Sequence, residues 1–453
     1  MASEVWFRRR IDVRCPDPEK GRNSRCYLAT SAILQQVPEL RRIQTGVLNL
    51  YLLDSGASLS INENADPTVR TDMDGAVKRM AESGLKAFSE SENKDKLPES
   101  TLIKSSLFGR SLTLPVSGGS VVFGTWQGIY LCSWDSSTSR EILVTVATLS
   151  PKLHKVASSS VSVSSRGVHN ITPNIISMFG LKISDDEKKS STKKAKYAPT
   201  ESDGAIYTII RHTSASMGIA AVNEGWCETL DKAFDTVVPE RWNDEFFIHT
   251  YEGPDDMPGH VKSSLFGVSA VVPVKQGSID MSDEVGVVLG EHRDVGGWGH
   301  SRRIAGIFMQ DSFVLSKSLE MTTGICDVTD LLNELTDGIS VGWCSLVAKS
   351  GVPAALVSVE SKPLDTKQEA GAQVQALAKG LRDAFDALTD EPGIGLAFAG
   401  RSLTIPIEDD KLVGSAKDRI FHVTEQQDDD DDGQQTNTVC GSLHVVVFGR
   451  RTK

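Results

Sequence analysis

A six-residue phrase, KSSLFG, occurs twice in this chain, at Lys104–Gly109 and at Lys262–Gly267. With roughly 10⁵ pairs of windows and about 6×10⁷ possible hexapeptides, coincidence is on the order of 10⁻³. Similar runs follow the two copies, RSLTLPV after the first and VSAVVPV after the second. A third related run, GRSLTIPI at Gly400–Ile407, resembles GRSLTLPV at Gly109–Val116. Recurrence at long intervals is typical of tandem structural units, so the sequence predicts three copies of one unit.

The chain length agrees with this division. A chain of 453 residues is long enough for about three domains of ~150 residues. We place the first unit at residues 1–150, the second at 151–310 and the third at 311–453. Two insertions interrupt the pattern: residues 184–202 are rich in Ser and Lys, and residues 425–438 contain a run of aspartates. A solvated surface loop is the simplest interpretation of both, and contact with a partner is the alternative.

Local patterns predict an α+β fold. The run Val47–Leu53 is typical of a strand, and Asp66–Pro67 predicts a helix start that continues to about Met80. Counterparts of this helix are expected near residues 228–237 and 367–388. Because the strand-like runs follow one another closely, we expect mainly antiparallel sheets with helices on one face.

A threonine before an apolar helix recurs in all three units. Thr30, Thr172 and Thr329 each precede apolar residues at helical spacing. In the second unit Thr172 is the expected N-cap, Pro173 the first helical residue, and Gly180 the stop.

Composition excludes several classes of protein. The net charge of −12 does not favour a nucleic-acid or anionic-membrane partner. The first residues lack an apolar run and no stretch of about 18 apolar residues occurs, so we expect neither a signal peptide nor membrane association. Its seven cysteines form no CxxC pair, which favours reduced thiols and a cytoplasmic location.

Histidines gather in the second unit. His212, His249, His260 and His292 lie close together in sequence, and His300 follows. Imidazole suits both metal ligation and proton transfer near neutral pH. No spacing such as HExxH is present, so either role remains open.

These residues stand in motifs that resemble those of the YjbQ family, the secondary thiamine-phosphate synthase proteins. The motifs in the first unit are NEN at residues 62–64, DPTVRTDM at 66–73 and GTWQ at 124–127. Those in the second unit are HTSAS at 212–216, NEG at 223–225, DDMPGHVKSS at 255–264 and EHR at 291–293. The resemblance covers the first two units well, and the third through GRSLTIPI and the helix start at Thr329.

Members of that family are homotrimers, so the resemblance implies a trimer fused into one chain. Neither of the first two units holds the full motif set: the first has Asp54, Leu102 and Trp134 where the second has His212, His260 and His292. A cleft between two neighbouring units can be lined by motif residues from both of them. We therefore expect one composite site between the first two units. The alternative is that all clefts are degenerate and the chain is a scaffold.

The resemblance implies roles for particular residues. His212, His260 and His292 are expected as a divalent-metal triad, for Mg or Zn, or as an acid–base set, and Glu224 as a carboxylate ligand or base. Lys262 and Arg293 supply positive charge for a phosphate. The expected substrate-binding residues are Asn62, Glu63, Trp126, Gln127, Thr213, Asn223, Lys262 and Arg293. Trp126 is equally typical of an aromatic face for a flat ring and of a core position.

The implied activity is the joining of a pyrimidine diphosphate to a thiazole phosphate, with release of pyrophosphate. The expected partner is thus a small phosphorylated metabolite, and the expected assembly a monomer that acts as an intramolecular trimer. A non-catalytic binding protein and a metal-dependent phosphohydrolase are the alternatives.

Overall fold

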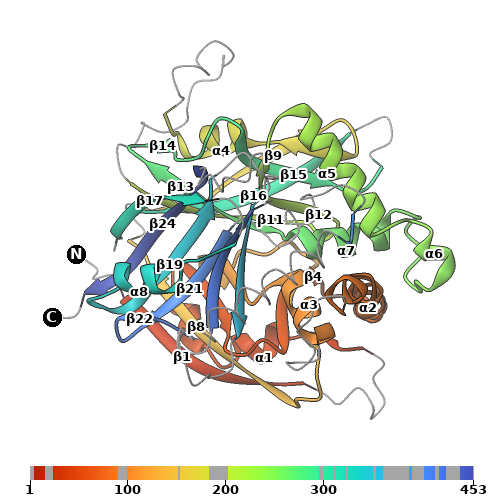
Figure 1. Ribbon diagram of the computed structural model, residues 1–453, viewed down its shortest axis with the longest axis horizontal. Coiled ribbons are helices and arrows are strands. Elements are labelled where there is room, and N and C mark those ends of the chain that lie inside the picture. Colours follow the sequence, from red (N-terminus) through yellow and green to blue (C-terminus); the bar gives the residue numbers. More distant parts are fainter. Residues whose placement is uncertain are drawn as a thin grey trace, which may run out of the picture.

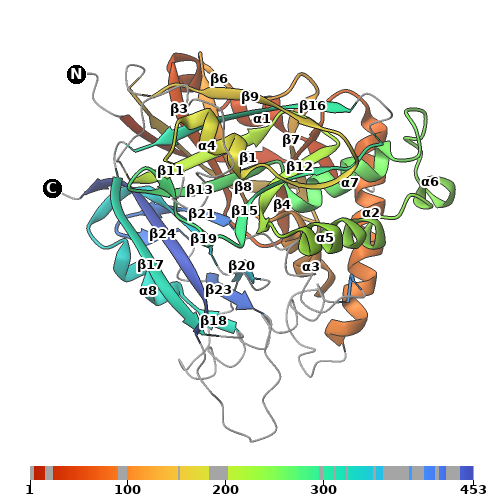
Figure 2. The same cartoon turned by 90° about the horizontal axis from the view of Figure 1, so that it is seen from above.

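The computed structural model describes residues 5–15, 24–89, 99–150, 154–182, 203–294, 299–310, 313–322, 325–349, 354–360, 387–389, 402–413, 418–424 and 439–451 (Figures 1 and 2). The expected insertions at residues 184–202 and 425–438 lie outside the described residues. So does nearly all of the helix expected near residues 367–388. Within the described part, no helix is long and apolar enough to cross a membrane.

Three sets of strands share one topology. Each set forms a five-stranded and a three-stranded antiparallel sheet, in the orders β1-β8-β3-β5-β6 and β2-β7-β4, β9-β16-β11-β13-β14 and β10-β15-β12, and β17-β24-β19-β21-β22 and β18-β23-β20. The prediction of repeated α+β units with antiparallel sheets is confirmed.

Unit 1 contains β1 (Val5–Arg14), β2 (Cys26–Leu28), α1 (Thr30–Leu34), η2 (Pro38–Arg42), β3 (Thr45–Leu52), β4 (Ala57–Glu63), α2 (Pro67–Ser89), α3 (Glu99–Phe108), β5 (Ser111–Ser117), β6 (Ser120–Val121), β7 (Gln127–Ser133) and β8 (Ser139–Thr148). Unit 2 contains β9 (Ala157–Val163), β10 (Gly167–Asn170), α4 (Thr172–Phe179), β11 (Gly204–Ile210), β12 (Ala215–Ala221), α5 (Glu224–Val237), α6 (Trp242–Glu245), α7 (Asp256–Phe266), β13 (Ser269–Lys275), β14 (Ser278–Ile279), β15 (Val285–Glu291) and β16 (His300–Met309). Unit 3 contains β17 (Phe313–Thr322), β18 (Ile325–Asp327), α8 (Thr329–Leu335), β19 (Ile339–Ala348), β20 (Ala354–Glu360), β21 (Ser402–Glu408), β22 (Lys411–Leu412), β23 (Asp418–Thr424) and β24 (Val439–Arg451).

The small sheet of unit 1 lies between the large sheet and the helices. On β7, Ile129 and Leu131 belong to the core shared with the large sheet, whereas Tyr130 and Cys132 belong to the core shared with α2. Successive side chains of a strand point to opposite faces, so one strand supplies both layers.

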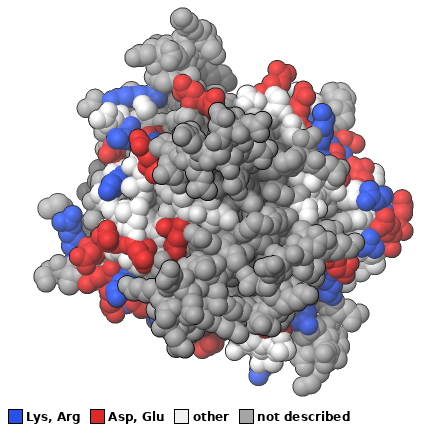
Figure 3. Space-filling model, in the orientation of Figure 1, with Lys and Arg blue, Asp and Glu red and all other residues white. Residues whose placement is uncertain are grey.

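The units pack around a common centre, as Figure 1 shows. There Trp343 of unit 3 donates its indole N–H to the Tyr207 hydroxyl of unit 2 at 2.8 Å. Trp6 of unit 1 stacks edge-on against Trp343, with ring centroids 4.6 Å apart. A large apolar core thus joins all three units. Around the rim of the face in Figure 3, acidic and basic side chains are interspersed.

The recurring threonine makes the same contact in every unit. The hydroxyl oxygens of Thr30, Thr172 and Thr329 accept backbone N–H groups from Ile129 (2.8 Å), Val287 (2.9 Å) and Ile420 (2.7 Å) respectively. Each threonine is the first helical residue, so the expected N-cap role of Thr172 is wrong: Ile171 holds that position, and no side chain caps the helix. The threonine instead ties the helix to the small sheet. Gly180 ends α4 in the left-handed conformation, as expected.

The repeated phrase KSSLFG forms the end of a helix. α3 and α7 terminate at Phe108 and Phe266, and the next residues, Gly109 and Gly267, have φ of 77° and 94°. Glycine adopts such angles at little cost. The phrase therefore encodes a helix stop that leads directly into the strands β5 and β13.

Equivalent residues also link neighbouring units. Arg211, which follows β11, donates to the Phe123 carbonyl of unit 1 at 2.9 Å. Lys349, which follows β19, lies 2.5 Å from the Asp280 carboxylate of unit 2, and His444 lies 2.6 Å from it. Burial alone would raise the pKa of Asp280, but hydrogen bonds from His444 and Lys349 outweigh it and hold that pKa below its usual range.

Asp280→Asn is expected to weaken the junction of units 2 and 3 by about 2 kcal/mol at pH 7, the typical contribution of hydrogen bonds to a charged group. A carboxylate whose pKa is lowered by folding stabilises above the pKa of the unfolded chain, about 3.9, and loses this effect as pH falls further. The difference in urea midpoint between wild type and variant should therefore shrink below about pH 4. Asp12→Asn, at an exposed position of β1, is the control. A difference that stays constant down to pH 3 would contradict this assignment.

Candidate functional site

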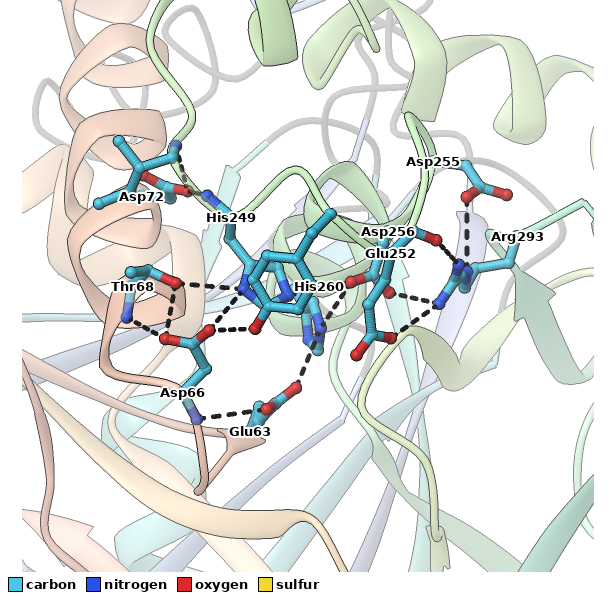
Figure 4. Close-up of polar contacts among 12 residues, drawn as sticks. Glu63, Asp66, Thr68, Asp72, His249, Glu252, Asp255, Asp256, His260 and Arg293 are labelled. Carbon is cyan, nitrogen blue, oxygen red and sulfur yellow. Dashed lines mark hydrogen bonds and ion pairs between the residues drawn. The ribbon is translucent and has the colours of Figure 1, made fainter.

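Units 1 and 2 meet where the end of β4 and the start of α2 lie against α7 and the loop before it (Figure 4). Asn62, near the end of β4, is fully buried in this junction. Its amide nitrogen donates to the His260 carbonyl and to the Ser264 hydroxyl, both at 2.7 Å. One side chain of unit 1 thus holds a full turn of α7.

Asn62 also determines the tautomer of His260. The Asn62 amide oxygen accepts the Glu63 backbone N–H at 2.8 Å and lies 2.7 Å from Nδ1 of His260. Because that oxygen only accepts, Nδ1 carries the proton and Nε2 of the neutral ring holds the lone pair. Burial lowers the pKa of His260 to about 4, so the ring is neutral at physiological pH.

The lone pair of His260 faces other acceptors. Nε2 lies 3.4 Å from Glu63 Oε2 and 3.8 Å from Asp256 Oδ2. Burial raises the pKa of Glu63, since its charged form is poorly solvated there. Acceptors that converge in this way need a proton or a cation between them.

His249 is the second imidazole of the site. The buried carboxylate of Asp72, on α2, accepts the backbone N–H groups of Ile248 (2.9 Å) and His249 (2.8 Å) and so fixes the loop. The ring bridges two carboxylates, with Nδ1 3.1 Å from Asp66 and Nε2 3.0 Å from Asp256. Burial opposes protonation of His249, but these two carboxylates outweigh it and raise its pKa.

Asp66 is held as an ionised carboxylate. It accepts hydrogen bonds from Tyr251 and from the Thr68 hydroxyl, the latter at 2.7 Å. Burial would raise the pKa of Asp66, but these hydrogen bonds and His249 lower it. The Tyr251 hydroxyl in turn has its pKa raised to about 12 by Asp66.

Glu63, His249 and His260 each offer a ligand atom, and these atoms lie within 4.8 Å of one another. No other such group of three occurs among the residues that the structure describes. We call these three residues the composite cluster, because Glu63 belongs to unit 1 and both histidines belong to unit 2. Its geometry matches the expected sharing of one site between two units, but its members differ from the expected triad.

His212 is held away from the composite cluster. Arg302 Nη1 lies 3.0 Å from its Nε2, and the Ser214 backbone N–H donates to its Nδ1 at 3.1 Å. Burial and, after it, the charge of Arg302 lower the pKa of His212 to about 3. In unit 1 Asp54 occupies the same place and pairs with Arg140 at 2.7 Å. The residue at this place is therefore paired with an arginine in both units, His212 with Arg302 and Asp54 with Arg140.

His292 and Lys262 also face away from it. His292 Nε2 lies 2.8 Å from the Ser216 hydroxyl, and the ring packs edge-on against Phe234. Lys262 pairs with Asp235 of α5 at 2.5 Å, and burial lowers the pKa of Lys262. Neither side chain joins His260: Lys262 lies on another face of α7, and His292 directly follows β15.

The remaining expected residues fall into two groups. In unit 2 Asn223 caps α5 by accepting the Trp226 N–H at 2.9 Å, and Glu224 is the exposed first residue of that helix. In unit 1 Gln127 reaches across to unit 2 and donates to the carbonyls of Ile210 (2.9 Å) and His212 (2.8 Å).

The GTWQ loop of unit 1 therefore contacts the segment of unit 2 that contains Ile210 and His212. Trp126, within that loop, is 60% exposed, so it is not a core residue. Its carbonyl accepts the Asn64 N–H at 2.7 Å, next to Glu63. Thr213 is buried one residue after His212.

Arg293 contacts the acidic residues next to the composite cluster. Its guanidinium donates to Asp256 Oδ1 at 2.5 Å and to the Glu252 carbonyl at 2.6 Å, and lies 3.4 Å from Asp255. With these partners its charge is directed at protein carboxylates. It positions Asp256 beside the two imidazoles.

Sequence reasoning did not assign His249, Asp66, Asp72, Tyr251 and Asp256 to the site. One signal was available: Asp256 and His260 are four residues apart, which places them on one face of a helix. The approach of α2 to the loop at His249 involves residues far apart in the chain, and no local pattern reveals it.

A family model matches the chain twice, once in each of the first two units. The family model described as "UPF0047 protein YjbQ-like" matches residues 18–148 and 188–310. "UPF0047 protein YjbQ" from Escherichia coli O157:H7 is 43% identical over 127 residues, which are 28% of this chain and 86% of that relative. "UPF0047 protein MJ1081" from Methanocaldococcus jannaschii is 31% identical over 117 residues, 26% of this chain and 80% of that protein. A solved structure of a YbjQ-like protein of unknown function from Sulfolobus solfataricus P2 shares 19% identity at a TM-score of 0.26, and covers 32% of this chain and 100% of that one.

Proposed function

Because the chain belongs to the YjbQ-like UPF0047 family and two of its units share the composite cluster, we propose that this cluster binds one divalent cation and acts on a small phosphorylated metabolite. The observation that carries the proposal is the convergence of Glu63, His249 and His260 within 4.8 Å. Nε2 of His260, without a proton, faces carboxylates there, and a cation satisfies all of these acceptors together.

The donor set suits a transition-type cation. Two imidazoles and one carboxylate are typical of Zn²⁺, whereas Mg²⁺ prefers oxygen ligands. Both imidazoles also have a partner that orients them, Asn62 for His260 and Asp66 for His249. Such hydrogen bonds from ligand histidines to amide or carboxylate oxygens are common around metals. The residues present therefore fit the cation.

A bound divalent cation would supply positive charge to a leaving diphosphate. The chain's own residues position it and the substrate: Asn62 and Asp66 orient the imidazoles, and Arg293 holds Asp256 beside them. Trp126, exposed beside Asn64, offers a face on which a planar ring can stack. These features support the reaction expected from the family resemblance, in which a pyrimidine diphosphate and a thiazole phosphate yield thiamine phosphate and pyrophosphate.

Release of pyrophosphate from these two substrates is the direct test. Zn²⁺-loaded wild type should release it, and His260→Ala should be slower by at least about 100-fold, because it loses a ligand of the cation. His169→Ala, which removes an imidazole outside the composite cluster that bonds to the Ser165 carbonyl at 2.9 Å, should retain full activity.

Two results decide against the reaction. Equal rates of pyrophosphate release in wild type and His260→Ala would mean that the composite cluster takes no part in the reaction. A wild type that binds Zn²⁺ but releases no pyrophosphate would refute transfer and leave a metal-binding protein, the alternative that the sequence kept open.

A further inference from the structure

Unit 1 contains a pocket of about 560 Å³, formed where the first turns of α2 lie beside β2 and the end of β1. Pro67 and Arg70 of α2 line it, and their spacing of three residues places them on one face of the helix. Thr68 and Asp72, which contact His249, are four residues apart on another face. The same helix therefore borders the composite cluster with one face and this pocket, which we call the α2 pocket, with another.

The guanidinium of Arg70 has no carboxylate partner in the part of the chain that the structure describes. The acidic residues one turn away on α2 pair with other groups, Asp66 with the Thr68 hydroxyl at 2.7 Å and Asp74 with Lys78 at 3.0 Å. Nη1 of Arg70 is shielded from solvent and forms no hydrogen bond. The half-buried guanidinium thus keeps its charge uncompensated.

The polar group near Arg70 is neutral. It is the hydroxyl of Tyr130, whose pKa is raised by burial, an effect that the charge of Arg70 opposes only in part. The same hydroxyl already donates to the Glu63 carbonyl. A protonated phenol does not neutralise a guanidinium, so an anion in the adjacent pocket would stabilise Arg70.

The rest of the described lining defines what kind of anion would fit. Arg14, at the end of β1, contributes a second guanidinium, and no acidic side chain occurs among the lining residues that the structure describes. Much of the remaining wall is apolar, with Leu28, Ala29 and Ala32 beside Pro67. Leu28 is 39% exposed, which is unusual for a large apolar side chain. Two positive charges beside an apolar wall favour a ligand with one anionic and one apolar end.

Unit 2 shows that the fold does not require this arginine. Asn62 and Asn223 hold the same place in the NEN and NEG motifs, so Arg70, eight residues after Asn62, corresponds to Asp231, eight residues after Asn223. Asp231 is a carboxyl whose pKa is raised by burial. A residue of opposite charge is thus accepted at the same place of the same helix, and the guanidinium is particular to unit 1 of these two units.

We propose that the α2 pocket binds a small phosphate monoester that carries an apolar group. Arg70 and Arg14 together balance the charge of about −2 that a phosphate monoester has at neutral pH, and a guanidinium offers paired donors to its oxygens. Leu28 and Pro67 contact the apolar group. The volume lies within the range of about 300–1,000 Å³ that is typical of small-molecule sites. No member of the composite cluster is among the described lining residues, so the two sites are separate.

Isothermal titration calorimetry of the full chain without added metal, with phenyl phosphate as the probe, tests this. Wild type should bind one phenyl phosphate per chain, at least about 10-fold more tightly than inorganic phosphate or phenol, because each of these lacks one of the two recognised parts. Arg70→Met, which removes the charge and keeps an unbranched stem, should weaken binding by at least about 10-fold. Arg70→Lys should retain part of the affinity, because it keeps the charge but not the fork of donors.

Leu28→Ser tests the apolar wall. It should weaken binding of phenyl phosphate and leave binding of inorganic phosphate unchanged. Because the Leu28 side chain is 39% exposed, this result stands even if Arg70→Met fails to fold. Arg42→Met, at an exposed arginine of η2, is the matched control and should bind phenyl phosphate normally.

Three outcomes would overturn the proposal. The first is the absence of saturable phenyl phosphate binding by wild type. The second is unchanged binding by both Arg70→Met and Leu28→Ser. The third is binding that is lost in His260→Ala but kept in Arg70→Met, which would assign the probe to the composite cluster instead.

Discussion

Purified chain stripped of metal is expected to bind one equivalent of Zn²⁺, not three. Only the junction of units 1 and 2 brings together two imidazoles and a carboxylate among the described residues. At the place equivalent to His260, unit 1 has Leu102, which offers no ligand atom. Isothermal titration calorimetry and elemental analysis measure the stoichiometry.

Glu63→Gln and His260→Ala should each weaken Zn²⁺ binding by at least about 100-fold. Loss of a ligand is expected to cost more than the 10–100-fold typical of residues that only orient a ligand. The comparison is informative because the two residues belong to different units. His292→Ala and His169→Ala are the controls, and both should leave the affinity unchanged.

Two results would refute this assignment. Loss of binding in His292→Ala with retention in Glu63→Gln would favour the triad expected from sequence over the composite cluster. Three equivalents of Zn²⁺ that survive both Glu63→Gln and His260→Ala would place the metal elsewhere in the chain.

The repeated fold was predictable because its signals are local. KSSLFG and the threonines at 30, 172 and 329 each encode one contact or one helix end, and the same short pattern produces the same geometry in each unit. The exact role of Thr172 was not predictable in this way, since its partner is the Val287 N–H at 2.9 Å, on a strand distant in sequence.

The junction of units 1 and 2 was predictable as a place where motifs of both units meet, but not residue by residue. Asn62, Glu63 and His260 were expected there, and the structure brings them together. His212 and His249 have similar sequence surroundings, and only the packing distinguishes them. Arg302 engages His212, whereas Asp72 directs His249 toward Asp66 and Asp256.

Asn62 provides the second large effect. Asn62→Ala removes three buried contacts of 2.7 Å to α7 of unit 2. Nδ1 of His260 and the Ser264 hydroxyl would then lose their buried Asn62 partner, and each such loss costs about 1–3 kcal/mol. We expect a loss of about 3 kcal/mol in the free energy of unfolding, measured by urea denaturation, and a 10–100-fold loss of Zn²⁺ affinity, because the His260 ring is no longer oriented.

The second unit supplies the matched control for this change. Asn223 occupies the same place in the NEG motif as Asn62 in NEN, but it is exposed and accepts one hydrogen bond, from the Trp226 N–H at 2.9 Å. Asn223→Ala should cost about 1 kcal/mol, as for other N-caps, and leave Zn²⁺ binding intact. Equal effects of the two substitutions would mean that Asn62 acts only as a structural turn residue. An unequal result would show that two copies of one motif have diverged, one into a helix cap and the other into a support of the composite cluster.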